Sequence, residues 1–215
     1  MVTLVWCSTA LAQGDSPDRP APLVLTDEQG RFLLGPYLEI LEDPSGELTI
    51  EDVTLDPPGP GRIAVDLAAC AICHSDISCA EGAWGGALPA VYGHEAAGRV
   101  SGLGEGVEGY AISDPVLVTL ITACGTCQAC AEDAPTSCAQ AWDARPSPIR
   151  DADGRPLAQG MKTGAFAEAV VVDASQCAPL PADLDLDLAS LLACGVITGV
   201  GAVANTARMR PGATV

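Results

Sequence analysis

One stretch of this 215-residue chain is the most informative about its fold: it reads Cys124-Gly125-Thr126-Cys127-Gln128-Ala129-Cys130 and is completed downstream by Cys138. The cysteines follow the spacing C-x2-C-x2-C-x7-C, at which one short lobe can fold four thiolates around a tetrahedral zinc ion. These thiols lie too close along the chain for independent disulfide bridges, and thiolates persist best in a reducing cytoplasm. The spacing therefore predicts a zinc-binding lobe over residues 121–140 of a cytoplasmic protein.

A second group of potential metal ligands lies outside this lobe. Upstream are Cys73-His74-Ser75-Asp76 and Gly93-His94-Glu95, and far downstream Cys194 stands in a run of small residues. A catalytic zinc needs three protein ligands and one open position. Such ligands can come from distant segments of the chain when the fold brings these segments together around a cleft. The sequence therefore indicates two metal sites of different character, although spacing alone does not select the ligands of the second.

The charge balance limits the partners. The chain carries 28 acidic and 10 basic residues, a formal net charge of −18, which repels phosphate backbones and anionic lipid headgroups. Nucleic acid and membrane-surface partners are therefore not expected.

The length of the chain suffices for one well-buried domain, or for one domain and part of a second.

The body of the chain is predicted to be mainly β with some α. Alternating apolar and polar residues, bounded by Gly, Pro and Asp, predict strands at 38–42, 48–53, 62–68, 97–100, 115–120 and 165–172. Helical periodicity is seen at 184–192, where aspartates suit a helix N-terminus. The uncharged run 188–207 is long enough for a bilayer, but its glycines and polar residues favour a buried helix or turn segment.

Several longer motifs occur in one order along the chain: Ala71-Ile72-Cys73-His74-Ser75-Asp76, Gly93-His94-Glu95-Ala96-Ala97-Gly98, the four-cysteine lobe, Cys194-Gly195-Val196-Ile197-Thr198-Gly199 and Arg210-Pro211-Gly212. In this order they resemble the motifs of the zinc-dependent medium-chain alcohol dehydrogenases. The resemblance extends over about residues 48–215. It implies a GroES-like, partly open β-barrel over 37–183, followed at 184–215 by a connecting helix and the first residues of a coenzyme-binding Rossmann domain that is truncated here.

The resemblance also implies the ligands of both metal sites. Cys73, His94 and Cys194 match the ligands of a catalytic zinc, and Asp76 matches the carboxylate that accepts a hydrogen bond from the ligand histidine and fixes its tautomer. The structural zinc of the family corresponds to Cys124, Cys127, Cys130 and Cys138. Two zinc ions per chain are therefore expected.

Further site residues follow by position. Ser75 matches the hydroxyl that takes the alcohol proton, and Glu95 matches an acid behind the metal that assists ligand exchange. His74 and Thr198 match positions that approach the nicotinamide cofactor. In the family a relay passes the alcohol proton from this hydroxyl to a terminal base, and here the chain departs from the pattern. Many relatives have a histidine where this chain has Ser78, and a serine hydroxyl cannot act as the terminal base near neutral pH. His74, which is also counted among the catalytic residues, or solvent would then take the place of that base.

The implied activity is oxidation of a small-molecule alcohol to an aldehyde or ketone, with hydride transfer to NAD or NADP. Zinc lowers the pKa of the alcohol, Ser75 relays its proton, and the alkoxide gives the hydride. The full-length protein is expected to form a homo-oligomer. The alternative is a non-catalytic zinc-binding fragment or module derived from the same family.

The N-terminal residues 1–36 fit the family less well and predict a disordered or signal-like leader. Ala10-Leu11-Ala12 is similar to the cleavage box of a signal peptide, but the segment is short and lacks a basic start. A cytoplasmic location is therefore expected, and export directed by this signal-like segment is the alternative. Residues 35–46 instead resemble the start of the extracellular sensor domain of certain bacterial seven-helix receptors.

Overall fold

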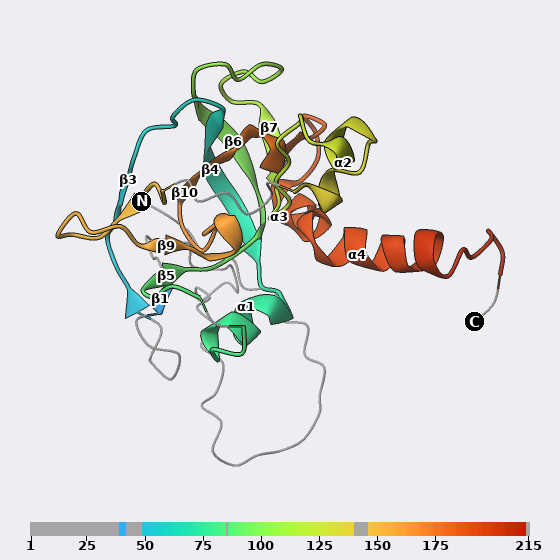
Figure 1. Ribbon diagram of the computed structural model, residues 1–215, viewed down its shortest axis with the longest axis horizontal. Helices are drawn as coiled ribbons and strands as arrows, with labels where there is room; N and C mark the ends of the chain where they lie inside the picture. Colours follow the sequence, from blue (N-terminus) through green and yellow to red (C-terminus); the bar gives the residue numbers. More distant parts are fainter. Residues whose placement is uncertain (1–38, 42–48, 85, 140–145, 214–215) are drawn as a thin grey trace, which may run out of the picture.

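The computed structural model describes residues 39–41, 49–84, 86–139 and 146–213. The predicted leader lies outside these described residues. Within them the chain is mainly β with short helices (Figure 1), which confirms the predicted fold class.

Apart from β4 and β6, which have 10 and 9 residues, the described strands and helices are short. The strands are β1 Glu39–Leu41, β2 Thr49–Ile50, β3 Thr54–Leu55, β4 Arg62–Ala71, β5 Ala90–Val91, β6 Glu95–Leu103, β7 Pro115–Val118, β8 Ile149–Arg150, β9 Ala158–Gln159, β10 Ala169–Asp173 and β11 Cys177–Pro179. The α-helices are α1 His74–Ala80, α2 Gln128–Ala131, α3 Leu186–Ser190 and α4 Gly195–Gly201. Single helical turns are η1 Pro135–Ser137, η2 Gly160–Lys162, η3 Ala174–Gln176, η4 Leu191–Ala193 and η5 Ala202–Thr206, of which η5 has π-helical hydrogen bonding.

A five-stranded antiparallel sheet forms the centre of the fold. Its strand order is β10-β4-β6-β7-β11, and β10 and β11 form its two opposite edges. A four-stranded sheet, β2-β1-β5-β9, and the pair β3-β8 accompany it. Because the edges of the central sheet are not joined to each other, the described strands form a partly open barrel, as predicted.

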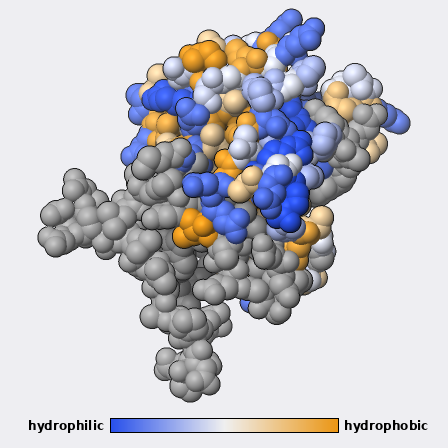
Figure 2. Space-filling model, turned by 90° about the vertical axis from the view of Figure 1, so that its left-hand side faces the viewer, coloured by the Kyte–Doolittle hydropathy of each residue, from blue (hydrophilic) through white to orange (hydrophobic). Residues whose placement is uncertain are grey.

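The core is built from small aliphatic side chains on this sheet. Val116 and Val118 of β7 are fully buried, and they alternate with partly exposed neighbours at the two-residue period of a strand. Ile63 and Val65 of β4 follow the same alternation. On the face shown in Figure 2, hydrophilic residues are interspersed with hydrophobic ones. The apolar groups that decide the fold are therefore inside the barrel.

Most predicted strands are confirmed, with shifted ends. The segments 62–68, 97–100 and 115–118 lie within β4, β6 and β7, and parts of 38–42 and 48–53 form β1 and β2. The strand predicted to start at 165 begins instead at Ala169. The earlier residues bond elsewhere: the Phe166 N–H donates to the carbonyl oxygen of Tyr92 at 2.8 Å.

The C-terminal run 188–207 is helical, and the prediction that it is buried holds for its first part only, where Ala189, Ser190 and Ala193 are buried. The prediction is wrong from 195 onward: Val196, Val200 and Val203 are 41%, 61% and 51% exposed, because α4 and η5 extend away from the sheets (Figure 1). Among the described residues no single helix is long and apolar enough to span a membrane. The segments Leu186–Ala193 and Gly195–Thr206, which meet at a 51° bend, pass that test only together.

Gly93 lies in the short connection between β5 and β6. It has a φ of +92°, and a Cβ atom built there would lie 2.5 Å from the backbone nitrogen of Phe166. Both the conformation and the lack of space exclude side chains. The next two residues, His94 and Glu95, are buried.

We expect Gly93→Ala to destabilise the fold by about 2–5 kcal/mol, because about 1–2 kcal/mol of left-handed strain adds to about 1–3 kcal/mol of overpacking. Gly106→Ala is the matched control, since Gly106 has a φ of +76° but open space around its Cβ position. Urea unfolding of both variants measures the difference. Equal losses for the two variants would contradict the steric argument.

Candidate metal centres

The four lobe cysteines form one compact cluster. Their sulfurs all lie within 4.8 Å of one another, and Cys127 Sγ is 3.6 Å from Cys130 Sγ and 3.9 Å from Cys138 Sγ. A disulfide would need about 2.05 Å, whereas sulfurs bound tetrahedrally at about 2.3 Å from one ion lie about 3.8 Å apart. All described cysteines are free thiols. The distances therefore fit a shared cation.

The lobe supplies its own hydrogen-bond donors to these sulfurs. Cys124 Sγ accepts from the N–H of Cys127 at 3.3 Å and from the N–H of Thr126 at 3.5 Å, and Cys138 Sγ accepts from the N–H of Cys124 at 3.3 Å. Donors to a thiolate favour its charged form. The Thr126 N–H, its hydroxyl and the Cys127 N–H accordingly lower the pKa of Cys124 to about 6. Desolvation instead raises the pKa of Cys130 to about 11.

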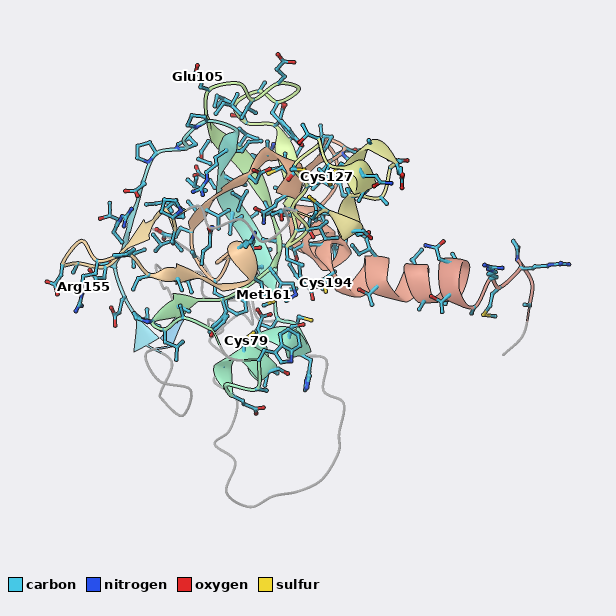
Figure 3. All side chains as sticks on the ribbon, viewed as in Figure 1. Cys79, Glu105, Cys127, Arg155, Met161 and Cys194 are labelled. Atoms are coloured by element: carbon cyan, nitrogen blue, oxygen red, sulfur yellow. The ribbon has the colours of Figure 1, made fainter. Side chains whose placement is uncertain are left out.

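A second cluster brings together Cys73, His94, Glu95 and Cys194, whose ligand atoms lie within 4.8 Å of one another. The two cysteines stand 121 residues apart in the chain, yet their sulfurs are 4.0 Å apart. Cys73 precedes α1, His94 and Glu95 stand at the entrance of β6, and Cys194 precedes α4. Figure 3 shows Cys194 at the base of α4 and Cys127 separately in the lobe.

A buried carboxylate holds the histidine of this second cluster. Asp76, 4% exposed, accepts from the N–H of Cys73 at 2.9 Å and from the N–H of Gly93 at 3.0 Å. Its Oδ1 is also 3.1 Å from His94 Nδ1. Because a carboxylate only accepts, Nδ1 of the neutral imidazole carries the proton and Nε2 presents a lone pair.

The other ring nitrogen supplies a test of whether the cluster suits a metal. His94 is fully buried, and its Nε2 has no hydrogen-bond partner in the described part of the chain. An unsatisfied buried polar atom costs about 1–3 kcal/mol. A cation bound between this lone pair and two thiolates would remove that cost, so the donor set fits a metal ion.

The charges of the second cluster also favour a cation. Burial, and then the neighbouring Cys73 and Glu95, raise the pKa of Cys194 to about 11. Glu95 Oε2 accepts from the N–H of Gly195 at 3.4 Å. Two thiols and one carboxyl group therefore lie close together, and a cation would balance the negative charge of their ionised forms. Ser75 Oγ lies 3.2 Å from one of these sulfurs, Cys73 Sγ.

The remaining predicted site residues lie around this cluster. His74 is exposed at the first residue of α1 and is not one of the clustered ligands. Thr198 is exposed on α4, four residues after Cys194, and its side chain acts to lower the pKa of that thiol. Thr126 was not predicted as a site residue. Its only sequence signal is a hydroxyl residue directly before the second cysteine of the lobe.

A separate cavity of about 290 Å³ lies elsewhere. Its lining includes Arg62 of β4, Lys162 of η2 and Gln176 of η3, and no member of either cluster. Neither candidate centre therefore lies in this cavity.

The partly open barrel, the four-cysteine lobe and the second cysteine–histidine cluster together define a zinc-type GroES-like domain. Residues 59–182 match the alcohol dehydrogenase GroES-like domain family, and the chain belongs to this family. The resemblance found in the sequence is thereby confirmed.

Individual relatives agree with this assignment. The chain is 35% identical over 182 residues to alcohol dehydrogenase class-3 of Pisum sativum, a match that covers 80% of this chain and 48% of that protein. It is 34% identical to alcohol dehydrogenase-like 4 of Arabidopsis thaliana, over 78% of this chain and 47% of that protein. The chain spans about half the length of these curated relatives.

Solved structures give the same result. An alcohol dehydrogenase zinc-binding domain protein from Burkholderia ambifaria superposes with a TM-score of 0.78 at 30% identity, covering 83% of this chain and 50% of that chain. Benzyl alcohol dehydrogenase from Acinetobacter calcoaceticus superposes with a TM-score of 0.73 at 22% identity, which supports the fold alone.

In protein stripped of metal and kept reduced, Cys124 is expected to be the first of the four lobe cysteines to be alkylated by limiting iodoacetamide near neutral pH, and Cys130 the last of the four. The reason is that a pKa of about 6 leaves Cys124 mostly as the reactive thiolate, whereas a pKa of about 11 keeps Cys130 protonated. Peptide mapping by mass spectrometry measures the order. The advantage of Cys124 should fade as the pH falls through about 6; equal labelling at neutral pH would contradict the hydrogen-bonding argument.

Proposed function

We propose that this chain supplies the catalytic domain of a zinc-dependent alcohol dehydrogenase, which interconverts a small-molecule alcohol and its aldehyde or ketone with NAD or NADP. The observation that carries the proposal is the convergence of Cys73 and Cys194 with the unpartnered Nε2 of His94. In this proposal these three residues hold the catalytic zinc. The structural zinc is held by Cys124, Cys127, Cys130 and Cys138.

The protein groups would divide the chemistry as follows. When bound, zinc supplies a Lewis acid that lowers the pKa of an alcohol in its open position. Two thiolates and a neutral imidazole leave the site formally neutral, and Asp76 keeps the His94 tautomer that presents Nε2. Ser75 receives the alcohol proton; its distance of 3.2 Å from Cys73 Sγ supports a role beside the metal.

Three further residues have proposed roles at the edges of the site. Glu95, buried within the cluster, assists ligand exchange. His74, exposed at the start of α1, passes the proton to solvent, because Ser78 cannot act as a base near neutral pH. His74 and Thr198 also face the cofactor, which the exposure of both side chains supports.

The context of the domain is proposed from the family. In this proposal the catalytic domain extends over 37–183, and from 184 a connecting helix leads into a coenzyme-binding domain. The family match at 59–182, which lies within the proposed catalytic domain, supports these bounds. Relationship to alcohol dehydrogenases supports assembly as a homo-oligomer and a cytoplasmic location.

Native mass spectrometry of protein purified without chelator is expected to find two zinc ions per chain. Cys194→Ala should remove one, and the matched lobe variant Cys127→Ala should remove the other. In protein that also carries the coenzyme-binding domain, alcohol-dependent reduction of NAD or NADP, followed by the absorbance of the reduced nicotinamide, should disappear in Cys194→Ala. A single zinc that survives Cys194→Ala, with no nicotinamide reduction by that longer protein, would favour the non-catalytic zinc module instead.

Asp76→Asn is expected to weaken zinc binding at the second cluster by about 10–100-fold, the usual effect of removing a partner of a ligand histidine. The asparagine side chain has one oxygen that accepts and one NH₂ group that only donates. It therefore cannot accept from the Cys73 N–H, the Gly93 N–H and His94 in the way that the two carboxylate oxygens do. Competition with a metallochromic chelator measures both zinc affinities. The lobe zinc is the internal control, and a parallel loss there would mean general unfolding.

A further inference from the structure

Both candidate centres have a hydroxyl residue two positions after one of their cysteines. Ser75 Oγ lies 3.2 Å from Cys73 Sγ, and Thr126 Oγ1 lies 3.6 Å from Cys124 Sγ. Each centre therefore has one sulfur with a hydroxyl group beside it.

The short contact between Ser75 and Cys73 is set by the start of α1. Cys73 is the residue that caps this helix, and Ser75 is its second residue. The Cys73 backbone is fixed by its hydrogen bond to Asp76 Oδ2 at 2.9 Å, which closes the same turn. The oxygen and the sulfur therefore project from one constrained turn, and their separation does not depend on long flexible side chains.

The direction of this hydrogen bond follows from the chemistry of a ligand sulfur. A cysteine that binds a metal has lost its proton, so its sulfur can only accept. The hydroxyl of Ser75 must then donate as long as no substrate is bound. To relay an alcohol proton, Ser75 must release its own proton towards His74 or solvent as it receives the other, and its hydrogen bond to Cys73 then breaks. Because a hydroxyl has one proton, the Ser75 oxygen is left with its lone pairs and can accept a hydrogen bond from an alcohol O–H.

We propose that Ser75 is a positioning residue that donates a hydrogen bond to the Cys73 thiolate and thereby weakens the electron donation of that sulfur to the metal. Hydrogen bonds to ligating sulfurs stabilise their lone pairs and tune the metal they bind. A weaker sulfur donor makes the metal a stronger Lewis acid. The proposal rests on the proposed function for the existence of the metal site, and it adds a role for Ser75 that precedes any substrate.

The test uses the full chain loaded with cobalt(II) in place of zinc, and reads the thiolate-to-cobalt charge-transfer absorption. Subtracting the spectrum of Cys194→Ala isolates the contribution of the second cluster. Ser75→Ala should move this isolated band to longer wavelength, because the sulfur electrons lose the stabilising proton. Ser75→Thr keeps the hydroxyl and should retain the original band. The matched lobe variant Thr126→Val should leave the isolated band unchanged.

The outcomes separate this inference from the proposed function. An unchanged band in Ser75→Ala would overturn the inference, and so would an equal shift or an equal loss of cobalt in Ser75→Ala and Ser75→Thr. If cobalt-loaded wild type and Cys194→Ala have the same spectrum, the second metal site itself is refuted. If the band shifts as expected but the zinc protein reduces no nicotinamide, the role of Ser75 stands and the proposed activity fails.

Discussion

The buried carboxylate of Asp76 is the interaction on which the second cluster depends. It accepts from the N–H of Cys73 before α1, from the N–H of Gly93 in the β5–β6 connection, and from the ring of His94 at the entrance of β6. A buried carboxylate is costly unless it is fully hydrogen-bonded. These segments therefore cannot shift independently, and the two residues that supply Cys73 Sγ and His94 Nε2 are held in register before any metal is present.

The central sheet extends this constraint to the rest of the molecule. Ala96, two residues after His94, pairs with Val118 at the end of β7, and the chain then runs directly into the lobe. The hydroxyl of Thr119 donates to the carbonyl oxygen of Ala193 at 3.1 Å, immediately before Cys194. One strand pairing and one hydrogen bond thus connect the lobe, β6 and the start of α4. The two candidate centres are consequently parts of a single framework.

The sequence predicted local features better than distant contacts. The alternation of apolar residues located β4, β6 and β7, and the cysteine spacing located the lobe, because both signals lie within a few residues. The second cluster was reached only through resemblance, since its contacts depend on strand pairing between remote segments. The seven residues of α1 are too few for a periodic signal. The exposure of α4 was missed because hydropathy does not tell where a helix points.

The two centres differ in how their negative charge is stabilised, and this contrast supports their proposed division of labour. In the lobe, backbone N–H groups of the same loop favour the Cys124 thiolate and lower its pKa, whereas desolvation raises the pKa of Cys130. In the second cluster, burial and neighbouring acidic groups raise the pKa of Cys194, and the Nε2 atom of His94 has no partner among the described residues. A lobe whose own backbone stabilises its ligands suits a permanent structural ion. A cluster whose charges remain unbalanced without a cation suits a catalytic metal. Such a metal keeps an open position, where its positive charge can act as a Lewis acid on a substrate oxygen.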